Sequence, residues 1–197
     1  MNRALYLTGC GYVAVSALVL ALQWRQTRVV EPHITVPAAQ FGGSGAQWFA
    51  AIKPYCNAVE VELQERQHPA PGTTEGAGYS AACYALAGKI DQARAVIQQL
   101  PAGERYKAAG IVFDVGHPVA DAGDDRSAGP IMELVLEYWP NHYMALYHAG
   151  MSEYILGHRD LSRTHLESFL KLYAADDGWR KNAVAVLGRL TPRPLRD

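Results

Sequence analysis

Apolar residues recur at helical spacing along most of the chain. Between residues 47 and 63 they include Trp48, Phe49, Ile52 and Val59, and similar patterns continue as far as residue 190. Apolar side chains three and four residues apart line one side of an α-helix. The pattern therefore predicts an all-α domain over residues 46–192, in which prolines and glycines mark the ends of the helices.

The predicted helices fall into pairs. We expect pairs at about residues 75–103, 104–140 and 141–174, with single capping helices at about 46–67 and 178–190. A small residue opens the second helix of each pair, namely Ala93, Ala128 and Ser162, which are spaced 35 and 34 residues apart. Gly88 and Gly157 predict tight turns between paired helices. The middle turn is expected to be about seven residues longer than in a regular unit.

These residues resemble the tetratricopeptide repeat, a family of antiparallel helix pairs in units of about 34 residues. The first pair carries most of the resemblance, through Ala81, Tyr84, Gly88, Asp91, Ala93 and Ile97. The third pair adds Gly150, Gly157 and Ser162. The resemblance implies a short solenoid of helical hairpins whose first helices line a concave face that binds a peptide or a partner protein.

The resemblance also implies which side chains lie on the concave face. They are apolar or aromatic and come from the first helices of the second and third pairs: Tyr106, Phe113, Met144, Tyr147, Met151 and Tyr154. Aromatic side chains and methionine are common in binding surfaces. The alternative is that several of them pack against neighbouring helices instead.

The amino-terminal region has a different pattern. Residues 4–22 contain no charged side chain, and a helix of this length would be about 28 Å long, close to the hydrocarbon thickness of a bilayer. We therefore expect a transmembrane anchor over residues 1–26, a linker rich in proline and glycine over residues 27–45, and a short tail at residues 193–197. A cleaved signal peptide and a lipoprotein signal ending at Cys10 are the alternatives.

Basic residues lie on both sides of the predicted anchor, so their distribution hardly decides its orientation. Arg3 precedes the apolar stretch, and Arg25 and Arg28 follow it. Because a very short amino-terminal tail usually stays in the cytoplasm, we expect a single-pass protein of a bacterial inner membrane with its soluble domain in the periplasm.

Charge and motifs exclude several functions. The formal net charge is −1, which argues against a nucleic-acid-binding protein because such proteins need a basic face to neutralise phosphates. The sequence lacks the zinc-protease, phosphate-loop and serine-hydrolase motifs, so we expect neither an enzyme nor a bound cofactor. Cys56 and Cys83 fall in predicted helices, where they are either two buried thiols or, in an oxidising compartment, a disulfide.

The segment from residue 113 to residue 126 contains one histidine and four aspartates. Carboxylates and an imidazole could hold a cation, but aspartate and glycine are also typical of exposed turns and helix caps. We favour turn formation and helix capping, and the candidates for contact with a partner are His117, Asp121, Asp124 and Asp125. Elsewhere, His158 and His165 could share a helical face, whereas His142 and His148 should not.

The function predicted from these features is that of a membrane-tethered scaffold. It would bind or stabilise partner proteins, as an accessory or assembly subunit of a membrane complex of the respiratory, photosynthetic or envelope type. One alternative is a structural subunit held mainly by its transmembrane helix and linker. The other is a metal-dependent enzyme that uses the His117 and Asp121 loop.

Overall fold

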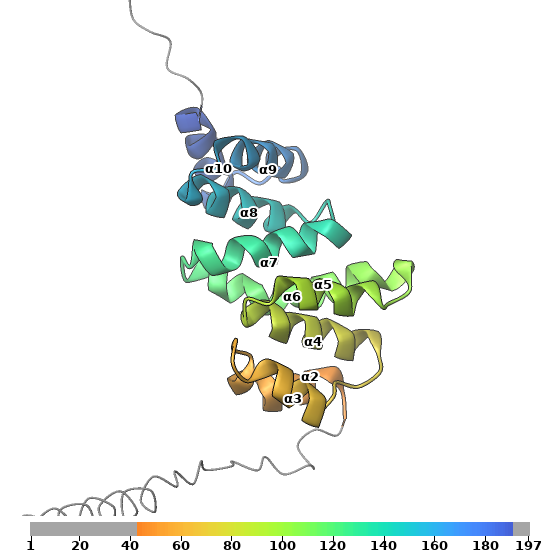
Figure 1. Ribbon diagram of the computed structural model, residues 1–197. Coiled ribbons are helices and arrows are strands. Elements are labelled where there is room, and N and C mark those ends of the chain that lie inside the picture. The colour runs from red at the N-terminus through yellow and green to blue at the C-terminus, as the bar shows by residue number, and fades with distance from the viewer. Residues whose placement is uncertain (1–42, 191–197) are drawn as a thin grey trace, which may run out of the picture. The chain divides into compact units, whose positions relative to one another are not determined.

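A computed structural model describes residues 43–190, and this part of the chain is entirely helical (Figure 1). Within it there are α-helices, short 3-10 turns and no β-strand, which confirms the predicted all-α class. The amino-terminal elements are α2 (Gly45–Ile52), η2 (Lys53–Tyr55) and α3 (Val61–Gln67). Pro54 lies in η2, where its missing N–H and its ring end the preceding helix.

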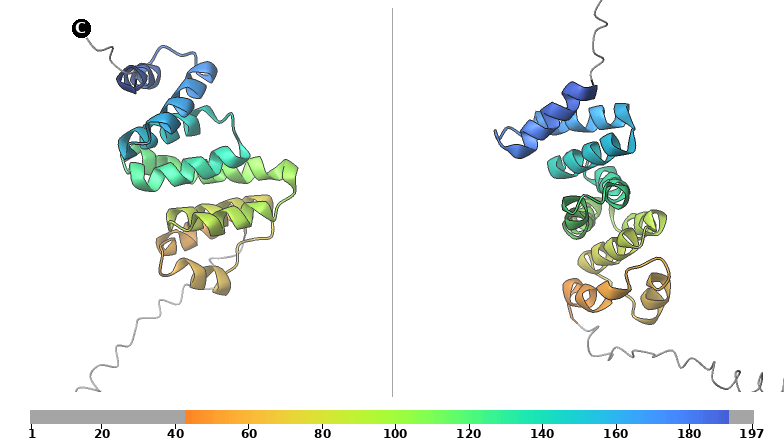
Figure 2. Two further views of the ribbon diagram at one scale, coloured as in Figure 1. Left: turned by 45° about the horizontal axis from the view of Figure 1, so that its top comes forward. Right: turned by 90° about the vertical axis from the view of Figure 1, so that its left-hand side faces the viewer.

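Three helical hairpins follow and occupy the regions predicted as helix pairs. They are α4 (Thr74–Leu86) with α5 (Ile90–Gln98), α6 (Arg105–Asp121) with α7 (Asp125–Tyr138), and α8 (Tyr143–Leu156) with α9 (Arg159–Leu172). The turn η3 (Ala102–Glu104) precedes α6, and α10 (Gly178–Leu190) is the last described helix. Figure 2 shows the helices following one another in chain order, from α2 and α3 at one end to α10 at the other.

Polar side chains fix where several helices begin. The backbone N–H of Gly76 donates to the Thr73 hydroxyl at 3.0 Å, and that of Ala145 donates to Nδ1 of His142 at 3.2 Å. The first N–H groups of a helix have no partner within the helix, so each such bond stabilises a helix start. Asp124 does the same for α7 through the N–H of Ser127.

A glycine in the left-handed conformation closes each hairpin. Gly88, Gly123 and Gly157 have φ angles of 73°, 78° and 87°, which side chains with a Cβ rarely tolerate. Gly123 lies 35 residues after Gly88 and 34 residues before Gly157. These are the same intervals that separate Ala128 from Ala93 and from Ser162. The prediction of a long middle turn was therefore wrong. The extra residues extend α6, which has 17 residues against 13 in α4 and 14 in α8.

Small residues allow the helices to approach closely. Ala93, Ala128 and Ser162 are completely buried. A Cβ on Gly78 would lie 2.7 Å from the side chain of Ile111, and one on Gly150 would lie 2.7 Å from that of Leu166. A side chain with a Cβ would fit at either position only if the neighbouring residue moved. Gly78 therefore sets the close spacing of α4 and α6, and Gly150 that of α8 and α9.

The hairpins do not stack on one another uniformly. The first and second hairpins meet mainly through their first helices, α4 and α6, whereas the second and third meet through α7 and α8. The backbones of α6 and α8 approach each other much less closely than those of α4 and α6. The space between α6 and α8 is occupied by rings, which are described below.

A second, smaller core joins α2 and α3 to α4. Trp48 and Ile52 are completely buried there, and the indole N–H of Trp48 donates to the carbonyl of His68 at 2.8 Å. Cys56 and Cys83 form a disulfide that links the end of η2 to α4. Of the two alternatives for these cysteines, the structure thus has the bonded form.

The predicted localisation requires correction. Among residues 43–190, no helix combines the length and the apolar character that a bilayer crossing requires. The longest of them, α6, has 17 residues and contains Lys107, Asp114 and His117. The prediction of a single-pass inner-membrane protein with a periplasmic domain is therefore not supported. The expected anchor at residues 4–22, most of the linker, Cys10 and the tail at residues 193–197 lie outside the described residues.

Candidate functional site

A continuous series of aromatic and imidazole rings runs from α6 across α8 to α10. We call it the ring chain. Its members, in order of contact, are Tyr106, Trp139, His142, Phe113, His117, His148 and Trp179. Successive ring centroids are 4.0–6.0 Å apart, so each ring packs directly against the next. The ring chain fills the space between α6 and α8.

Phe113 and His117 organise the centre of the ring chain. They are four residues apart on α6, so their rings lie one above the other on one face of the helix, with centroids 4.9 Å apart. Phe113 contacts His142 and His117 contacts His148. His142 and His148 therefore both belong to the ring chain, through contacts with different residues of α6, and His142 lies just before the first turn of α8.

The ends of the ring chain are exposed. Tyr106, Trp139 and Trp179 are 44%, 39% and 36% exposed, and Tyr143, whose ring stacks on His142, is 44% exposed. Beside Trp139 and Tyr143 is a groove of about 350 Å³, lined by Gly110, Phe113, Asp114, Trp139, His142, Tyr143 and Met144. Large exposed aromatic side chains gathered around one groove are typical of interaction surfaces.

The residues predicted for the concave face are divided between this surface and the core. Tyr106, Phe113 and Met144 belong to the ring chain or line the groove. Tyr147 is 4% exposed and packs between Phe169 and Trp179. Met151 and Tyr154 are partly buried against the main core. The structure thus brings three of the six together and uses the other three mainly in packing.

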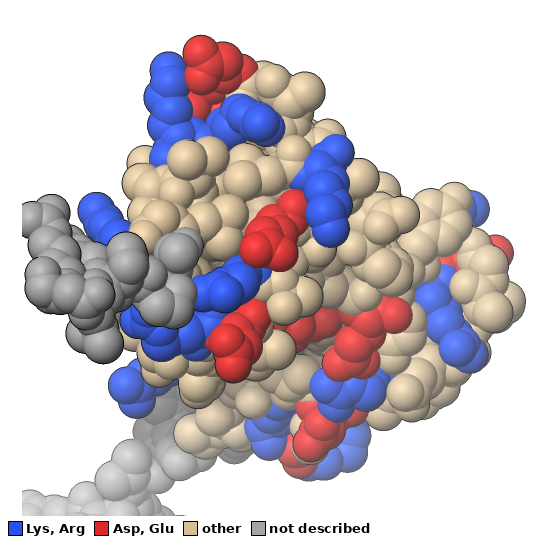
Figure 3. All heavy atoms as spheres, turned by 90° about the horizontal axis from the view of Figure 1, so that it is seen from above, with Lys and Arg blue, Asp and Glu red and all other residues tan. Residues whose placement is uncertain are grey.

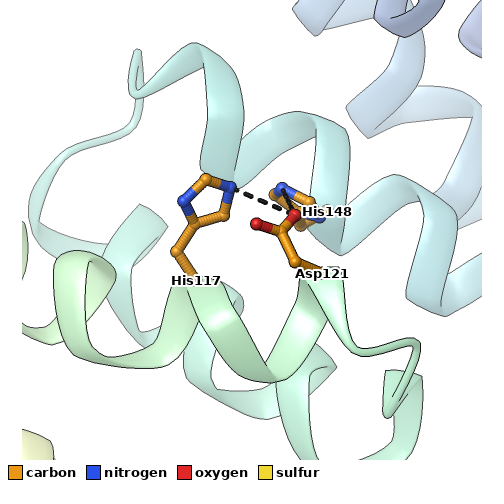
Figure 4. Close-up of side chains that lie close together, drawn as sticks. All are labelled: His117, Asp121 and His148. Carbon is orange, nitrogen blue, oxygen red and sulfur yellow. Dashed lines mark ion pairs between the residues drawn. The ribbon is translucent and has the colours of Figure 1, made fainter.

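His117 and Asp121 lie on a helix, not in the predicted loop. α6 continues to Asp121, with Pro118 inside it. His117 and Asp121 are one turn apart, and His148 of α8 faces them (Figure 4). Nε2 of His117 is 3.5 Å from Oδ1 of Asp121, and Nε2 of His148 is 3.8 Å from the same oxygen. We call these three residues the His–Asp–His cluster.

Asp124 and Asp125 of this segment have separate roles. Asp124 caps α7, and Asp125 accepts a hydrogen bond from the hydroxyl of Ser152 at 3.2 Å. The capping role expected for aspartates in this segment therefore applies to Asp124. Neither residue joins the His–Asp–His cluster.

Burial governs the protonation of two histidines in this region. His148 is 5% exposed, and burial, reinforced by the neighbouring His117, lowers its pKa to about 4, although Asp121 acts in the opposite direction. Burial also lowers the pKa of His142. At pH 7 the imidazole of His148 is therefore neutral, and one of its ring nitrogens carries a free lone pair.

The remaining carboxylate–histidine pairs are isolated from this cluster. His165 of α9 lies 2.7 Å from Glu133 of α7, and His158 contacts Glu153. His158 precedes α9 as its cap residue, and His158 and His165 have different partners. Each pair links two neighbouring elements and contains one imidazole.

A larger cleft lies at the other end of the described region. It has a volume of about 700 Å³ and lies between the segment after α3, α4 and the end of α5. Its titratable residues include Glu65, whose carboxylate accepts a hydrogen bond from Ser80 at 2.6 Å. Burial raises the pKa of Glu65 despite this bond. The cleft contains no cluster of histidines or exposed aromatic rings, so it offers less chemistry than the ring chain.

Several residues of the site were missed in the sequence. Trp139, Tyr143 and Trp179 lie at helix ends, where the helical periodicity that guided the prediction no longer applies. The spacing of Phe113 and His117 did contain a signal, because residues four apart share a helix face. It was overlooked because the segment was interpreted as a turn.

Charged side chains are mixed on the surface. On the face drawn in Figure 3, Lys and Arg side chains alternate with Asp and Glu side chains, without a continuous field of either sign. A nucleic-acid-binding face would concentrate basic side chains. This face therefore offers little to a phosphate backbone.

Comparisons with known proteins gave no match: neither a family model, nor a curated protein, nor a solved structure matches the chain.

Proposed function

We propose that this chain is a scaffold that binds a segment of another protein on the exposed part of the ring chain. In this proposal the three hairpins form a short solenoid similar to the tetratricopeptide repeat. The observation that carries the proposal is the exposure of Trp139 and Tyr143 in the walls of one groove, with the exposed ring of Tyr106 packed against Trp139.

The hairpin geometry supports the solenoid part of the proposal. The turn glycines Gly88, Gly123 and Gly157 recur at intervals close to the family's unit length. Each is followed five residues later by a completely buried small residue at which the paired helices cross. In a solenoid each unit contacts mainly its neighbours, and the surface of the stacked units remains available to a ligand.

The chemistry of the groove favours a peptide with apolar and basic side chains. Its walls are mainly aromatic, so they can bury apolar groups of a partner, at about 25 cal/mol per Å². The faces of Trp139 and Tyr143 can also accept a lysine or arginine side chain through cation–π contact. Asp114, exposed in the same groove, supplies a carboxylate for the same cation.

Photo-crosslinking from single positions tests this proposal. A benzophenone amino acid would replace Tyr143 in the full chain, expressed in its native cells. The matched control places the same group at Leu161 of α9, which is 52% exposed and outside the groove. We expect a discrete crosslinked protein from position 143 and none from position 161.

A second step shows whether the groove itself binds the partner. Trp139→Ala should reduce the crosslink from position 143 at least about tenfold, because large aromatic residues dominate the binding energy of such surfaces. Equal crosslinking from positions 143 and 161, or a yield that Trp139→Ala does not change, would contradict the proposal.

A further inference from the structure

The His–Asp–His cluster has a feature that a simple ion pair does not explain. Both histidines direct Nε2 toward the same oxygen of Asp121, at 3.5 Å and 3.8 Å. These separations are too long for hydrogen bonds between an imidazole and a carboxylate, which are about 2.7–2.9 Å when charged. Nε2 of His165 and Oε1 of Glu133 lie closer, at 2.7 Å, although their geometry does not form a hydrogen bond either.

The ring nitrogens at the centre of the cluster are also without partners. Nε2 of His117 and Nε2 of His148 are inaccessible to solvent and make no hydrogen bond to any residue of the described region. A buried polar atom that lacks a partner costs free energy. His148 is 5% exposed, so bulk water does not compensate for the missing bond.

We propose that His117, Asp121 and His148 form a binding site for a first-row divalent transition-metal ion such as Zn²⁺. The candidate ligand atoms lie within 4.8 Å of one another. In a tetrahedral zinc site, ligand atoms are about 3.3 Å apart. The widest separation must therefore close by about 1.5 Å, which small rotations of an imidazole ring and of the carboxylate can supply.

The fold holds the three ligands in place from two sides. His117 and Asp121 are i and i+4 on α6, which puts both on one helix face. The ring of His117 stacks on Phe113, and the ring of His148 lies against Tyr147 and Trp179. Ring packing of this kind restricts how the imidazoles turn and favours one orientation of the ligand atoms.

The ligand set selects the class of ion. Two imidazoles and one carboxylate suit zinc and neighbouring transition metals, whereas calcium and magnesium prefer oxygen ligands throughout. Three protein ligands leave one coordination position open. The side chain of Asp121 is 49% exposed, so the open position can face solvent and accept a water molecule or a group from a bound partner.

Metal titration of the full chain tests the site. Protein freed of metal with a chelator would be titrated with Zn²⁺ by calorimetry and with Co²⁺ by visible absorption, since the Co²⁺ spectrum reports ligand type and geometry. We expect one ion per chain at this site. His117→Gln, Asp121→Asn and His148→Gln should each weaken binding by more than about 100-fold, beyond the loss seen when only outer groups around a metal are changed.

His165→Gln is the matched control, because it removes an imidazole that faces a single carboxylate. It should leave the affinity for Zn²⁺ unchanged. Asp121→Asn replaces an exposed side chain by one of the same size, so this variant should fold normally. Circular dichroism checks the folding, and a folded variant that binds Zn²⁺ weakly has lost a ligand and not its structure. The proposal is overturned if the full chain binds no Zn²⁺, or if binding persists in all three variants or falls equally in His165→Gln.

Discussion

The amino-terminal and carboxy-terminal halves of the described region are built in different ways. From α2 to α6, helices approach each other through glycine and alanine, and a disulfide joins Cys56 to Cys83. From α6 to α10, the space between α6 and α8 is filled by rings, several of them imidazoles. Close backbone contact leaves no room for a ligand between α4 and α6, whereas the rings between α6 and α8 are side chains that can contact one.

The two halves also differ in whether their polar side-chain atoms have hydrogen-bond partners. In the amino-terminal half the partly buried carboxylate of Glu65 accepts a hydrogen bond from Ser80. In the carboxy-terminal half Nε2 of His117 and of His148 have none among the described residues. The comparison indicates that the first half mainly maintains the fold, while the second carries groups that remain available for binding.

The largest expected effect concerns the disulfide of the amino-terminal half. Replacing Cys56 and Cys83 together by alanine should lower the free energy of unfolding by about 3.5 kcal/mol. The reason is that the bond joins residues 27 positions apart and so restricts a loop of that length in the unfolded chain. Urea denaturation measures the change. A reductant should have the same effect on the wild-type chain and none on the double variant. Equal stability of wild type and double variant would show that the small core around Trp48 holds this half without the bond.

The second effect is the pH dependence of the free energy of unfolding that His148, in the carboxy-terminal half, should cause. The pKa of His148 is about 4 in the folded chain and 6.5 in the unfolded one. Between these values the unfolded chain binds a proton that the folded chain does not, so stability decreases as pH falls from 6.5 toward 4. The expected loss is up to about 3 kcal/mol.

Urea denaturation at pH 7 and pH 4.5, in buffer containing a chelator, tests this expectation. Carboxylates also titrate in this range, so the useful quantity is the difference between the wild type and His148→Gln. The variant should lose less stability on acidification. If both lose the same amount, His148 does not supply the pH dependence.

The third effect compares two glycines of similar helical context. A Cβ on Gly78 would lie 2.7 Å from Cδ1 of Ile111 and 3.2 Å from the backbone of Ala108. Gly78→Ala should therefore destabilise the protein by about 1–2 kcal/mol, since overpacking outweighs the better helix propensity of alanine. Gly110 faces the ring chain, where a Cβ would meet only Trp139 at 3.4 Å.

Gly110→Ala is the matched substitution in the carboxy-terminal half. It should leave the free energy of unfolding unchanged or raise it by up to about 1 kcal/mol. Thermal or urea denaturation of both variants gives the comparison. A larger loss from Gly110→Ala than from Gly78→Ala would reverse our view of which half is closely packed.

The smallest effect is expected from the exposed aromatic residues. Tyr143→Ala should change the free energy of unfolding by about 1 kcal/mol or less, because the side chain is 44% exposed and lies outside the core. Phe169→Ala, at a completely buried position, should cost about 3–5 kcal/mol. A similar loss for both would assign Tyr143 to the fold and not to a binding surface.

The sequence by itself determined the helical class and the order of the hairpins. Helical periodicity is a local property, and so are the turn glycines and the small residues Ala93, Ala128 and Ser162, which allow two helices to cross whatever surrounds them. The length of α6 was mistaken because aspartates, glycines and a proline near residue 120 favour a turn locally. Packing of Val112, Phe113 and Gly116 against neighbouring helices instead keeps that segment helical.

The tertiary structure alone decided which side chains meet. His148 joins His117 and Asp121 across two helices. At helix ends, Trp139 contacts Tyr106 of α6 and Tyr143 contacts His142. The positions of these residues in the sequence do not predict these contacts, because contacts between helices depend on how each helix is rotated about its axis and on the distance between the helices. That rotation is set by the packing of all side chains together, which periodicity along one helix does not specify.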